Sequence, residues 1–376
     1  LVLFALILVL LVFGLAFSKA GDVVIGGAGA KPEYTMWQWF SMSLKGGIGT
    51  GILFWAMGEP IFHMAAPPAA AGAQPFTREA GLFAISQTML HWTIAQYAMY
   101  SLCAVGVALM AYNRRRTISV SSIFEPYLSS SVYGVVKTVV PMVSLFCIVG
   151  ALACSMAVGL MQINSGLNFF FGLPIDGVTV FAIAAIMVTV YVVSCLTGIK
   201  KGMRVLSSFC TIVFIGLMVY VLCLGPTRFI VDAGTESLGV FFNRFFEHSV
   251  ILPTMAENET WSKSWIIMFM ASFFVYAPII GLFLARLGKG RTVREFIFMN
   301  IGAPTLFCIV WIAIWGGTTV WLQYTGIMDV WQSVNEKGLE VTIFTILSTL
   351  PFAKILAAFF IIAVFFSFST MADSIT

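Results

Sequence analysis

Long apolar runs are the feature that most constrains what this chain can fold into. A helix that crosses a bilayer needs about 20 mostly apolar residues. Runs of this kind occupy residues 1–17, 37–58, 82–112, 137–171, 177–198, 205–225, 265–285, 296–322 and 352–376. The first and last are cut short, and those longer than a bilayer requires are expected to tilt or kink. The runs lack the polar–apolar alternation of membrane-barrel strands. The sequence therefore predicts an all-α protein that crosses a membrane many times.

Charge is too scarce for a water-soluble fold. Of the 376 residues, 60% are hydrophobic and 10% are charged, whereas soluble domains carry about 25% charged residues. Lysines and arginines lie in short clusters between the apolar runs, which argues against a nucleic-acid partner. The seven cysteines lie inside apolar runs without metal-ligand spacing, so we interpret them as small buried hydrophobes.

Basic and acidic residues separate onto opposite sides of the predicted membrane. Positively charged loops face the cytoplasm, and the loops that alternate in the required order are 18–36, 114–116, 200–204 and 286–294. Acidic residues gather in the intervening loops, at 59–81, 226–264 and 323–351. Loop 286–294 is also expected to meet anionic lipid.

Shorter helices are expected between the spans. Residues 238–250 mix phenylalanine pairs with charged residues, which predicts a helix lying at the membrane interface, and a second short helix is expected at 341–350. The sequence begins at Leu1 and ends at Thr376 inside apolar runs, so we expect a fragment of a longer protein.

Glycines concentrate inside the second apolar run. Gly46, Gly47, Gly49 and Gly51 fall within residues 45–51, and each costs a helix about 1 kcal/mol relative to alanine. Unwound backbone at membrane depth must be buried in protein or line a cavity, and broken helices of secondary transporters hold solute and ions. Close helix packing on small residues is the alternative.

Four motifs follow one another along the chain in a characteristic order. They are Gly-Ile-Gly-Thr-Gly-Ile-Leu-Phe-Trp-Ala-Met-Gly-Glu-Pro at 47–60, His91-Trp92-Thr93 with Tyr97 and Tyr100, the segment 283–296, and Thr-Met-Ala-Asp-Ser at 370–374. Together they resemble the betaine/choline/carnitine transporter (BCCT) family over nearly the whole chain. The resemblance implies a multi-pass protein of the inner (plasma) membrane, a homotrimer, that moves a small organic solute by alternating access.

The resemblance also implies a division of the chain into two inverted five-helix repeats. On this map residues 1–17 are a peripheral transmembrane helix and 36–225 the first repeat. Residues 226–264 form an external loop with an interfacial helix, and 265–376 form an incomplete second repeat.

An aromatic cage is the expected solute site. A trialkylammonium head has no N–H to donate, so it is held by aromatic faces worth about 0.5–2 kcal/mol each. The resemblance assigns Trp92, Tyr97 and Tyr100 to such a cage, with the backbone of Gly47, Gly49 and Gly51 beside it. Packing or an interfacial aromatic belt is the alternative.

The second half of the cage departs from the family pattern. Where the family resembles Trp-Trp-x-x-Trp, this chain carries Ser272, Phe273 and Tyr276. The weaker rings and the added hydroxyl predict an altered or weaker preference relative to glycine betaine. Another small organic cation, such as a sulfonium compound, is the alternative solute.

The coupling-ion region also departs from the family. The resemblance places a sodium ion between the unwound helix, near Lys45 and Ile48, and the stretch containing Thr370, Met371 and Asp373. Lys45 replaces a small residue there and Met371 replaces a hydroxyl ligand. We hypothesise that the Lys45 ammonium substitutes for sodium, facing Asp373, so that transport is sodium-independent or proton-linked. Snorkelling of Lys45 to the membrane surface is the alternative.

No other residues suggest chemistry. Glu59 and Pro60 are expected to end the broken helix at the outer mouth. His63, His91 and His248 show no ligand spacing, so neither a metal nor an acid–base role is expected, and no cofactor is predicted. An enzyme is disfavoured because no nucleophile–base set or paired carboxylates stand out. An ion channel, the remaining rival, requires a continuous polar pore.

Overall fold

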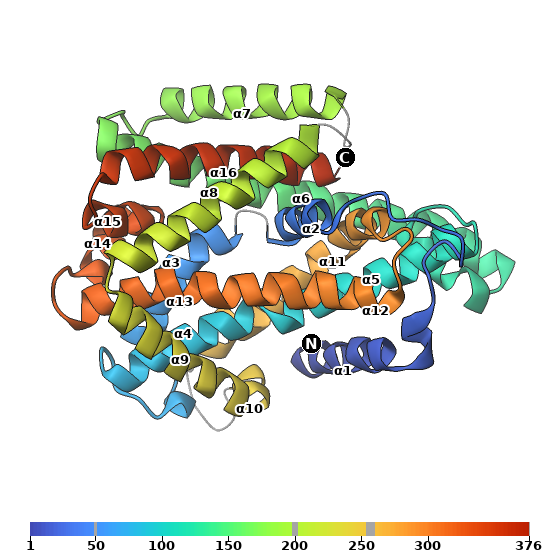
Figure 1. Cartoon of the computed structure of the whole chain (residues 1–376), viewed down its shortest axis with the longest axis horizontal. Helices are drawn as coiled ribbons and strands as arrows, with labels where there is room; N and C mark the ends of the chain where they lie inside the picture. The colour runs from blue at the N-terminus through green and yellow to red at the C-terminus, as the bar shows by residue number, and fades with distance from the viewer. Residues whose placement is uncertain (49–50, 198–201, 253–259, 376) are drawn as a thin grey trace.

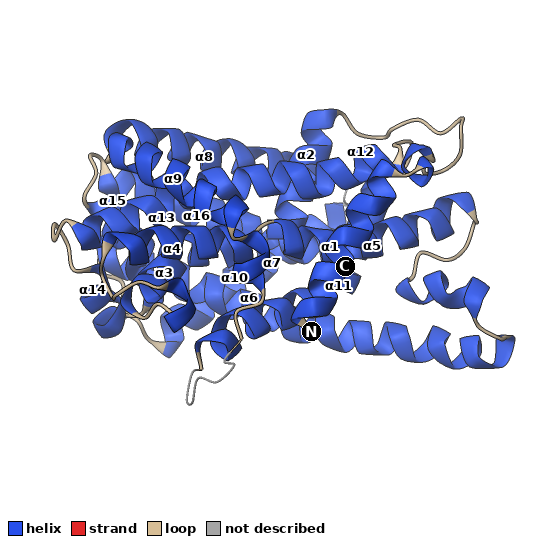
Figure 2. Cartoon of the chain, turned by 90° about the horizontal axis from the view of Figure 1, so that it is seen from below, coloured by secondary structure: helices blue, strands red, loops and turns tan. Residues whose placement is uncertain are grey.

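The chain is a bundle of helices. The computed structural model describes residues 1–48, 51–197, 202–252 and 260–375, although some side chains, including those of 45–48 and 369–375, lie outside that description. Figure 1 shows the long helices running side by side along the molecule, with α7 outermost on one flank. Over the described residues Figure 2 shows helices and loops without a strand, which confirms the all-α prediction.

The helices follow the predicted spans closely. In the first part of the chain they are α1 (Val2–Phe17), α2 (Met36–Ile48), α3 (Gly51–Ala65), α4 (Arg78–His91), α5 (Ile94–Ala108), α6 (Ser130–Phe171), α7 (Gly177–Thr197) and α8 (Gly202–Leu224). The second part contains α9 (Thr227–Asn243), α10 (Phe245–Ser249), a π-helical turn η5 (Lys263–Ile267), α11 (Met268–Leu287), α12 (Val293–Ile297), α13 (Ala303–Tyr324), α14 (Val330–Lys337), η7 (Leu339–Val341), α15 (Thr342–Ser348) and α16 (Ala353–Ile375).

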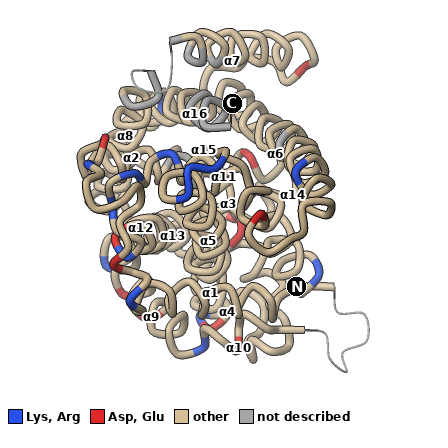
Figure 3. The backbone as a smooth tube through the Cα atoms, turned by 90° about the vertical axis from the view of Figure 1, so that its right-hand side faces the viewer, with Lys and Arg blue, Asp and Glu red and all other residues tan. Residues whose placement is uncertain are grey.

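Many of these helices can cross a membrane. Within the described residues, five continuous stretches are long and apolar enough: Arg78–Asn113, Ser130–Phe171, Val205–Leu224, Lys263–Leu287 and Val293–Tyr324. The other predicted spans correspond to α1, to the pair α2 and α3, to α7 and to α16. Seen end-on in Figure 3, most of the backbone is uncharged and charged positions are few, as a lipid-facing bundle requires.

The predicted span 82–112 is divided in the middle. Helix α4 ends at His91, the backbone of Thr93 leaves the helical region (φ −126°, ψ −120°), and α5 begins at Ile94. The Thr93 hydroxyl donates to the carbonyl oxygen of Met89 at 2.6 Å, and this kind of back-bonding bends helices. Span 82–112 is longer than a bilayer requires and was therefore expected to tilt or kink. The structure places the kink at Thr93, inside the continuous apolar stretch Arg78–Asn113.

The segment 226–264, predicted as an external loop, is more helical than expected over its described residues. Helix α9 begins at Thr227, well before the predicted start at residue 238, and α10 follows it after Arg244. Helix α9 packs against α4 and α13. The second predicted short helix, 341–350, corresponds to η7 and α15, whereas α14 was missed although Asp329 caps it by accepting the N–H of Gln332.

Two of the basic loops meet at one end of the bundle. The backbone of Ile25 donates to Arg291 O at 2.9 Å and accepts from Gly290 N at 2.8 Å, and Asp22 pairs with Arg294 at 2.7 Å. Gly290 has φ +81°, and a Cβ on it would lie 2.3 Å from the carbonyl carbon of Lys31, so only glycine fits. Loops 18–36 and 286–294 therefore lie on the same side, as predicted.

Helices α5 and α11 pack against each other at close range. A Cβ on Gly281 of α11 would lie 2.7 Å from the sulfur of Cys103 on α5. The missing side chain lets the two helices approach, as small residues do in membrane proteins. This contact fixes the position of α11, which carries much of the site described next.

Candidate functional site

Aromatic side chains of α3, α4, η5 and α11 form one cluster. The ring of Trp92, at the end of α4, makes edge contacts with Phe269 (5.2 Å between centroids) and Phe273 (5.8 Å) of α11. Trp55 of α3 contacts Phe269 at 5.9 Å and Trp265 at 5.8 Å. We call these five residues, Trp55, Trp92, Trp265, Phe269 and Phe273, the ring cluster.

Regular spacing produces one side of the ring cluster. Trp265, Phe269 and Phe273 recur every four residues, so they share one helix face. Their rings stack in sequence, at 6.1 Å between the first two and 5.8 Å between the last two. Trp265 lies in the π-helical turn η5, a kind of local distortion that is frequent at functional sites.

Gly51 makes room for the Trp92 ring. A Cβ on Gly51 would lie 2.6 Å from the Cη2 atom of Trp92, so the indole packs directly against the start of α3. Of the predicted glycines, Gly47 lies in the backbone of α2, and Gly49 falls outside the described residues. Residues 45–48 are the last turn of α2 and Gly51 begins α3, so the predicted unwinding is wrong for these residues, because glycine weakens a helix without preventing it. Residues 49–50 lie outside the described residues.

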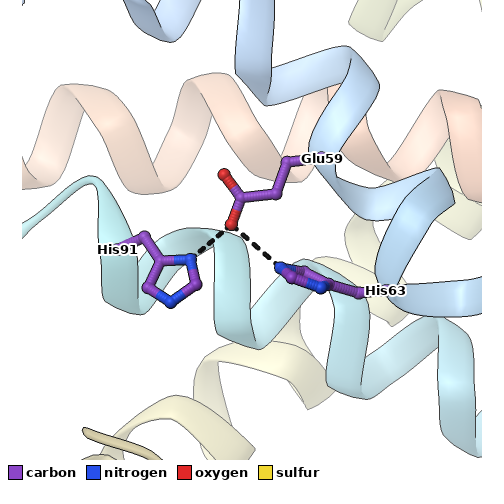
Figure 4. A group of neighbouring side chains, drawn as sticks. All are labelled: Glu59, His63 and His91. Atoms are coloured by element: carbon purple, nitrogen blue, oxygen red, sulfur yellow. Dashed lines mark hydrogen bonds and ion pairs between the residues drawn. The ribbon is translucent and has the colours of Figure 1, made fainter. Parts of the chain in front are cut away.

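A buried carboxylate lies next to the ring cluster. Glu59 of α3 is fully buried, and Figure 4 shows His63 and His91 converging on one of its oxygens. His91 Nδ1 lies 2.5 Å and His63 Nε2 lies 3.0 Å from Glu59 Oε1, and the indole N–H of Trp92 donates to Oε2 at 2.8 Å. We call Glu59, His63 and His91 the carboxylate–histidine group.

This group corrects two expectations from the sequence. Glu59 and Pro60 do not end the broken helix, because α3 continues to Ala65; Glu59 finds its partners inside the bundle, and α13 packs closely on Pro60 at Gly316. His63 and His91 are brought together, although they lie 28 positions apart in the sequence. His248 stays apart, with its ring against Phe83 at 5.2 Å.

The distances between the oxygen of Glu59 and the ring nitrogens of the two histidines are those of hydrogen bonds. Its three nearest ligand atoms lie within 4.8 Å of one another, a set that could in principle face a cation. The two O···N separations of 2.5 and 3.0 Å are hydrogen-bond lengths. Tetrahedral zinc with bonds of about 2.0–2.1 Å would hold its ligand atoms about 3.3 Å apart. The three side chains therefore form a hydrogen-bonded group.

The other predicted cage residues have different partners. Tyr97 and Tyr100 make an edge contact at 6.2 Å, and the Tyr97 hydroxyl lies 3.3 Å from Cys308 Sγ. The Tyr276 hydroxyl donates to Ala151 O at 2.9 Å and lies 2.7 Å from Ser155 Oγ. The structure thus brings Trp92, Phe273 and Gly51 together. It ties Tyr276 to α6 and the Ser272 hydroxyl to Met268 O of its own helix.

Sequence reasoning missed several members of the site. Trp55, Trp265 and Phe269 were not singled out, and Glu59, His63 and His91 were dismissed. Two signals were present: the i, i+4 spacing of Glu59 and His63, which places both on one helix face, and the four-residue period that ends at Phe273. No spacing rule could have joined His91 to Glu59, because they belong to different helices.

The coupling-ion region is described only in its backbone. Lys45 and Ile48 belong to α2, and Thr370, Met371 and Asp373 belong to α16, while their side chains lie outside the description. Helices α2 and α16 pack against each other, as the hypothesis that pairs Lys45 with Asp373 requires. The hypothesis itself stays a prediction.

Comparison with known proteins gives one consistent answer. The family model described as betaine/carnitine/choline family transporter matches residues 1–376. The glycine betaine transporter OpuD of Bacillus subtilis (strain 168) is 30% identical over 365 residues, which is 96% of this chain and 70% of that protein. The ectoine/hydroxyectoine transporter of Virgibacillus pantothenticus is 29% identical over 371 residues, covering 98% and 73% of the two chains. The chain belongs to the betaine/carnitine/choline family of transporters.

Proposed function

We propose that this integral membrane protein carries out secondary active transport of a small solute with a quaternary-ammonium or related cationic head, by alternating access. The ring cluster is the observation that carries the choice of solute. Family membership supports transport, and the relatives are named for glycine betaine and for ectoine.

The ring cluster has the chemistry that such a solute needs. A trialkylammonium group offers no hydrogen to donate, so dispersion and the negative faces of rings must hold it, at about 0.5–2 kcal/mol per ring. Trp92 at the end of α4 and Phe273 of α11 contribute two of the rings. The indole N–H of Trp92 donates a hydrogen bond to the carboxylate of Glu59. The rings of the cluster contact one another in this structure, so a bound solute would have to move them apart. Such a rearrangement is expected for a site that opens and closes during transport.

Solute binding tests this proposal. We expect Trp92→Leu and Phe269→Leu each to weaken choline or betaine binding about tenfold, the loss of about 1.4 kcal/mol that one ring supplies. Trp37→Leu is the matched control, since the Trp37 side chain is 44% exposed and outside the ring cluster. A thermal-shift screen with betaine, choline, carnitine and sulfonium compounds identifies the solute.

Tyr276→Leu tests the second half of the predicted cage independently of the Trp92 half. It removes the hydrogen bonds to α6 as well as a ring. If Tyr276 belongs to the solute site, this variant loses affinity like Trp92→Leu. Unchanged affinity in both variants would remove the cage altogether.

Counterflow in proteoliposomes separates a transporter from an ion channel. Unlabelled internal solute accelerates entry of labelled solute only when one site faces the two sides in turn. We expect saturable uptake with counterflow; linear, non-saturating flux would instead indicate a channel.

A further inference from the structure

The carboxylate of Glu59 is a buried negative charge, and among the described side chains no lysine or arginine lies beside it. Its electrostatic partners in the described part of the chain are His91 and His63. With both histidines neutral, the carboxylate–histidine group carries one negative charge inside an apolar bundle, which is costly. One added proton makes the group neutral, so it is built to take up either a proton or a neighbouring cation.

The surroundings of His91 can accommodate both of its charge states. His91 Nδ1 faces Glu59, while its Nε2 lies 3.0 Å from the side-chain nitrogen of Gln87. An amide nitrogen can only donate, so Nε2 accepts here and the His91 ring is neutral in this arrangement. The Gln87 oxygen is buried and has no hydrogen-bond partner among the described residues. Turning the Gln87 amide by about 180° presents that oxygen to a protonated Nε2, so both N–H groups of charged His91 are satisfied.

His63 is less suited to hold the added proton. Its Nε2 bonds to Glu59, but its Nδ1 is buried and has no partner among the described residues. A second proton on His63 would leave a buried N–H unsatisfied. The proton therefore belongs on His91.

Charged groups on the packed helices engage other partners. On α4 and α9, Arg78 pairs with Glu236, and Arg228 pairs with Asp232. Among the described residues, no ion pair or hydrogen bond joins the group to the charged side chains of the neighbouring short helices, which are Glu247, His248, Lys263, Lys337 and Glu340. The proton on His91 is thus governed by Glu59, Gln87 and whatever occupies the ring cluster.

We propose that His91, held between Glu59 and Gln87, is a proton-exchange site at which a proton and a cationic solute compete for the charge of Glu59. The inference rests on the proposed function. Trp92 bonds to Glu59 and belongs to the ring cluster, and His91 contacts Phe269 at 4.9 Å. A cation that binds the rings stabilises the ionised carboxylate with neutral His91, and the displaced proton leaves to the bulk solvent.

Calorimetry of choline binding to the whole chain tests the competition. We expect the affinity for choline to be about tenfold lower at about pH 5.5 than at about pH 8, because added protons compete with the cation for the charge of Glu59. At intermediate pH the binding enthalpy should depend on the buffer, because a proton is released. Glycine betaine, whose carboxylate compensates its own ammonium, should show a smaller change.

Substitutions of Gln87 give opposite shifts if the assignment is correct. Gln87→Met removes the acceptor for the charged ring and should move the loss of affinity to lower pH. Gln87→Glu adds a negative acceptor and should move it to higher pH. His248→Gln, which removes a buried histidine outside the group, should leave the profile in place.

The outcomes are distinguishable. Choline binding that is equal at both pH values, with a buffer-independent enthalpy, overturns the proton-exchange site and leaves the proposed function standing. Gln87 variants that shift the profile in the same direction overturn the role of Gln87 and His91. Absence of binding for every solute at pH 8 overturns the proposed function itself.

Discussion

Gly51 is the residue on which the geometry of the solute site depends most directly. Because it has no side chain, the Trp92 ring rests against the first turn of α3. The ring is held at its other side by the hydrogen bond to Glu59. The position of Trp92 is therefore fixed by one absent methyl group and one buried carboxylate.

Substitution of Gly51 should impair solute binding without unfolding the bundle. A Cβ would lie 2.6 Å from the indole, so Gly51→Ala must push Trp92 out of place. We expect a loss of affinity of about tenfold, comparable to the loss of one ring. Solute-dependent thermal shift measures it.

Gly216→Ala is the control for this substitution. Gly216 also lies inside a membrane helix, but a Cβ there meets nothing within 4 Å. It should bind solute normally. Equal effects of the two alanines would mean that helix propensity, rather than the Trp92 contact, is responsible.

At this scale the sequence predicted part of the site. Trp92, Phe273 and Gly51 were predicted to line a solute site; they lie close together, and their contact with solute stays a prediction. The carboxylate–histidine group was not, because Glu59 and His91 are 32 positions apart on separate helices, and only the tertiary packing of α3 on α4 unites them.

The start of α7 offers an element whose stability depends on pH. The backbone N–H of Thr179 donates to Asp176 Oδ1 at 2.8 Å, in the manner of a helix cap. This hydrogen bond lowers the pKa of Asp176, which lies outside the span. A carboxyl group with a lowered pKa stabilises the fold above its unfolded pKa and loses that contribution as pH falls through the folded value.

Asp176→Ala should therefore reduce thermal stability at neutral pH by a small amount that disappears in acid. The measurement is the unfolding temperature of wild type and variant between pH 7 and about pH 3. A difference that stays constant over this range would contradict the assignment of the cap to the ionised form.

Packing of α5 against α11 should tolerate no side chain at Gly281. A Cβ would lie 2.7 Å from the sulfur of Cys103, and overpacking of this kind costs about 1–3 kcal/mol. We expect Gly281→Val to lower the temperature at which the purified protein leaves the monodisperse peak in size-exclusion chromatography. Gly150→Val, in α6 with nothing within 4 Å, should not.

Helices were easier to predict from sequence than their interruptions. Apolar runs set where α6, α8 and α13 lie, because lipid requires a continuous apolar helix. The position of the kink between α4 and α5 could not be predicted, because it depends on one threonine hydroxyl and on the packing around Trp92. Helix α14 was missed because it is short and polar.

At the scale of the whole molecule, sodium dependence tests the Lys45 hypothesis. If the Lys45 ammonium replaces the ion, uptake into proteoliposomes should be the same with and without a sodium gradient. Lys45→Ala should then abolish transport or make it depend on sodium. Strong sodium dependence of the wild type would refute the substitution.

The family resemblance predicted more of the architecture than the residues did by themselves. Composition and apolar runs predicted a multi-span helical protein, and the structure agrees. The inverted repeat and the homotrimer came only from the resemblance, since the two halves share no visible sequence pattern, and they stay predictions. Native mass spectrometry of the protein in nanodiscs would test the trimer.

The interruption at Trp92 and Thr93 connects two separately packed parts of the bundle. Helix α4 rests on α3, α9 and α13, while α5 rests on α11, α1 and α12. Any rotation of one part relative to the other passes through this joint, where the indole that we propose as a solute contact is located. Solute binding would then change the angle between α4 and α5 at this joint. Nitroxide labels near Arg78 and Asn113 should report a changed distance between the two helices when solute binds.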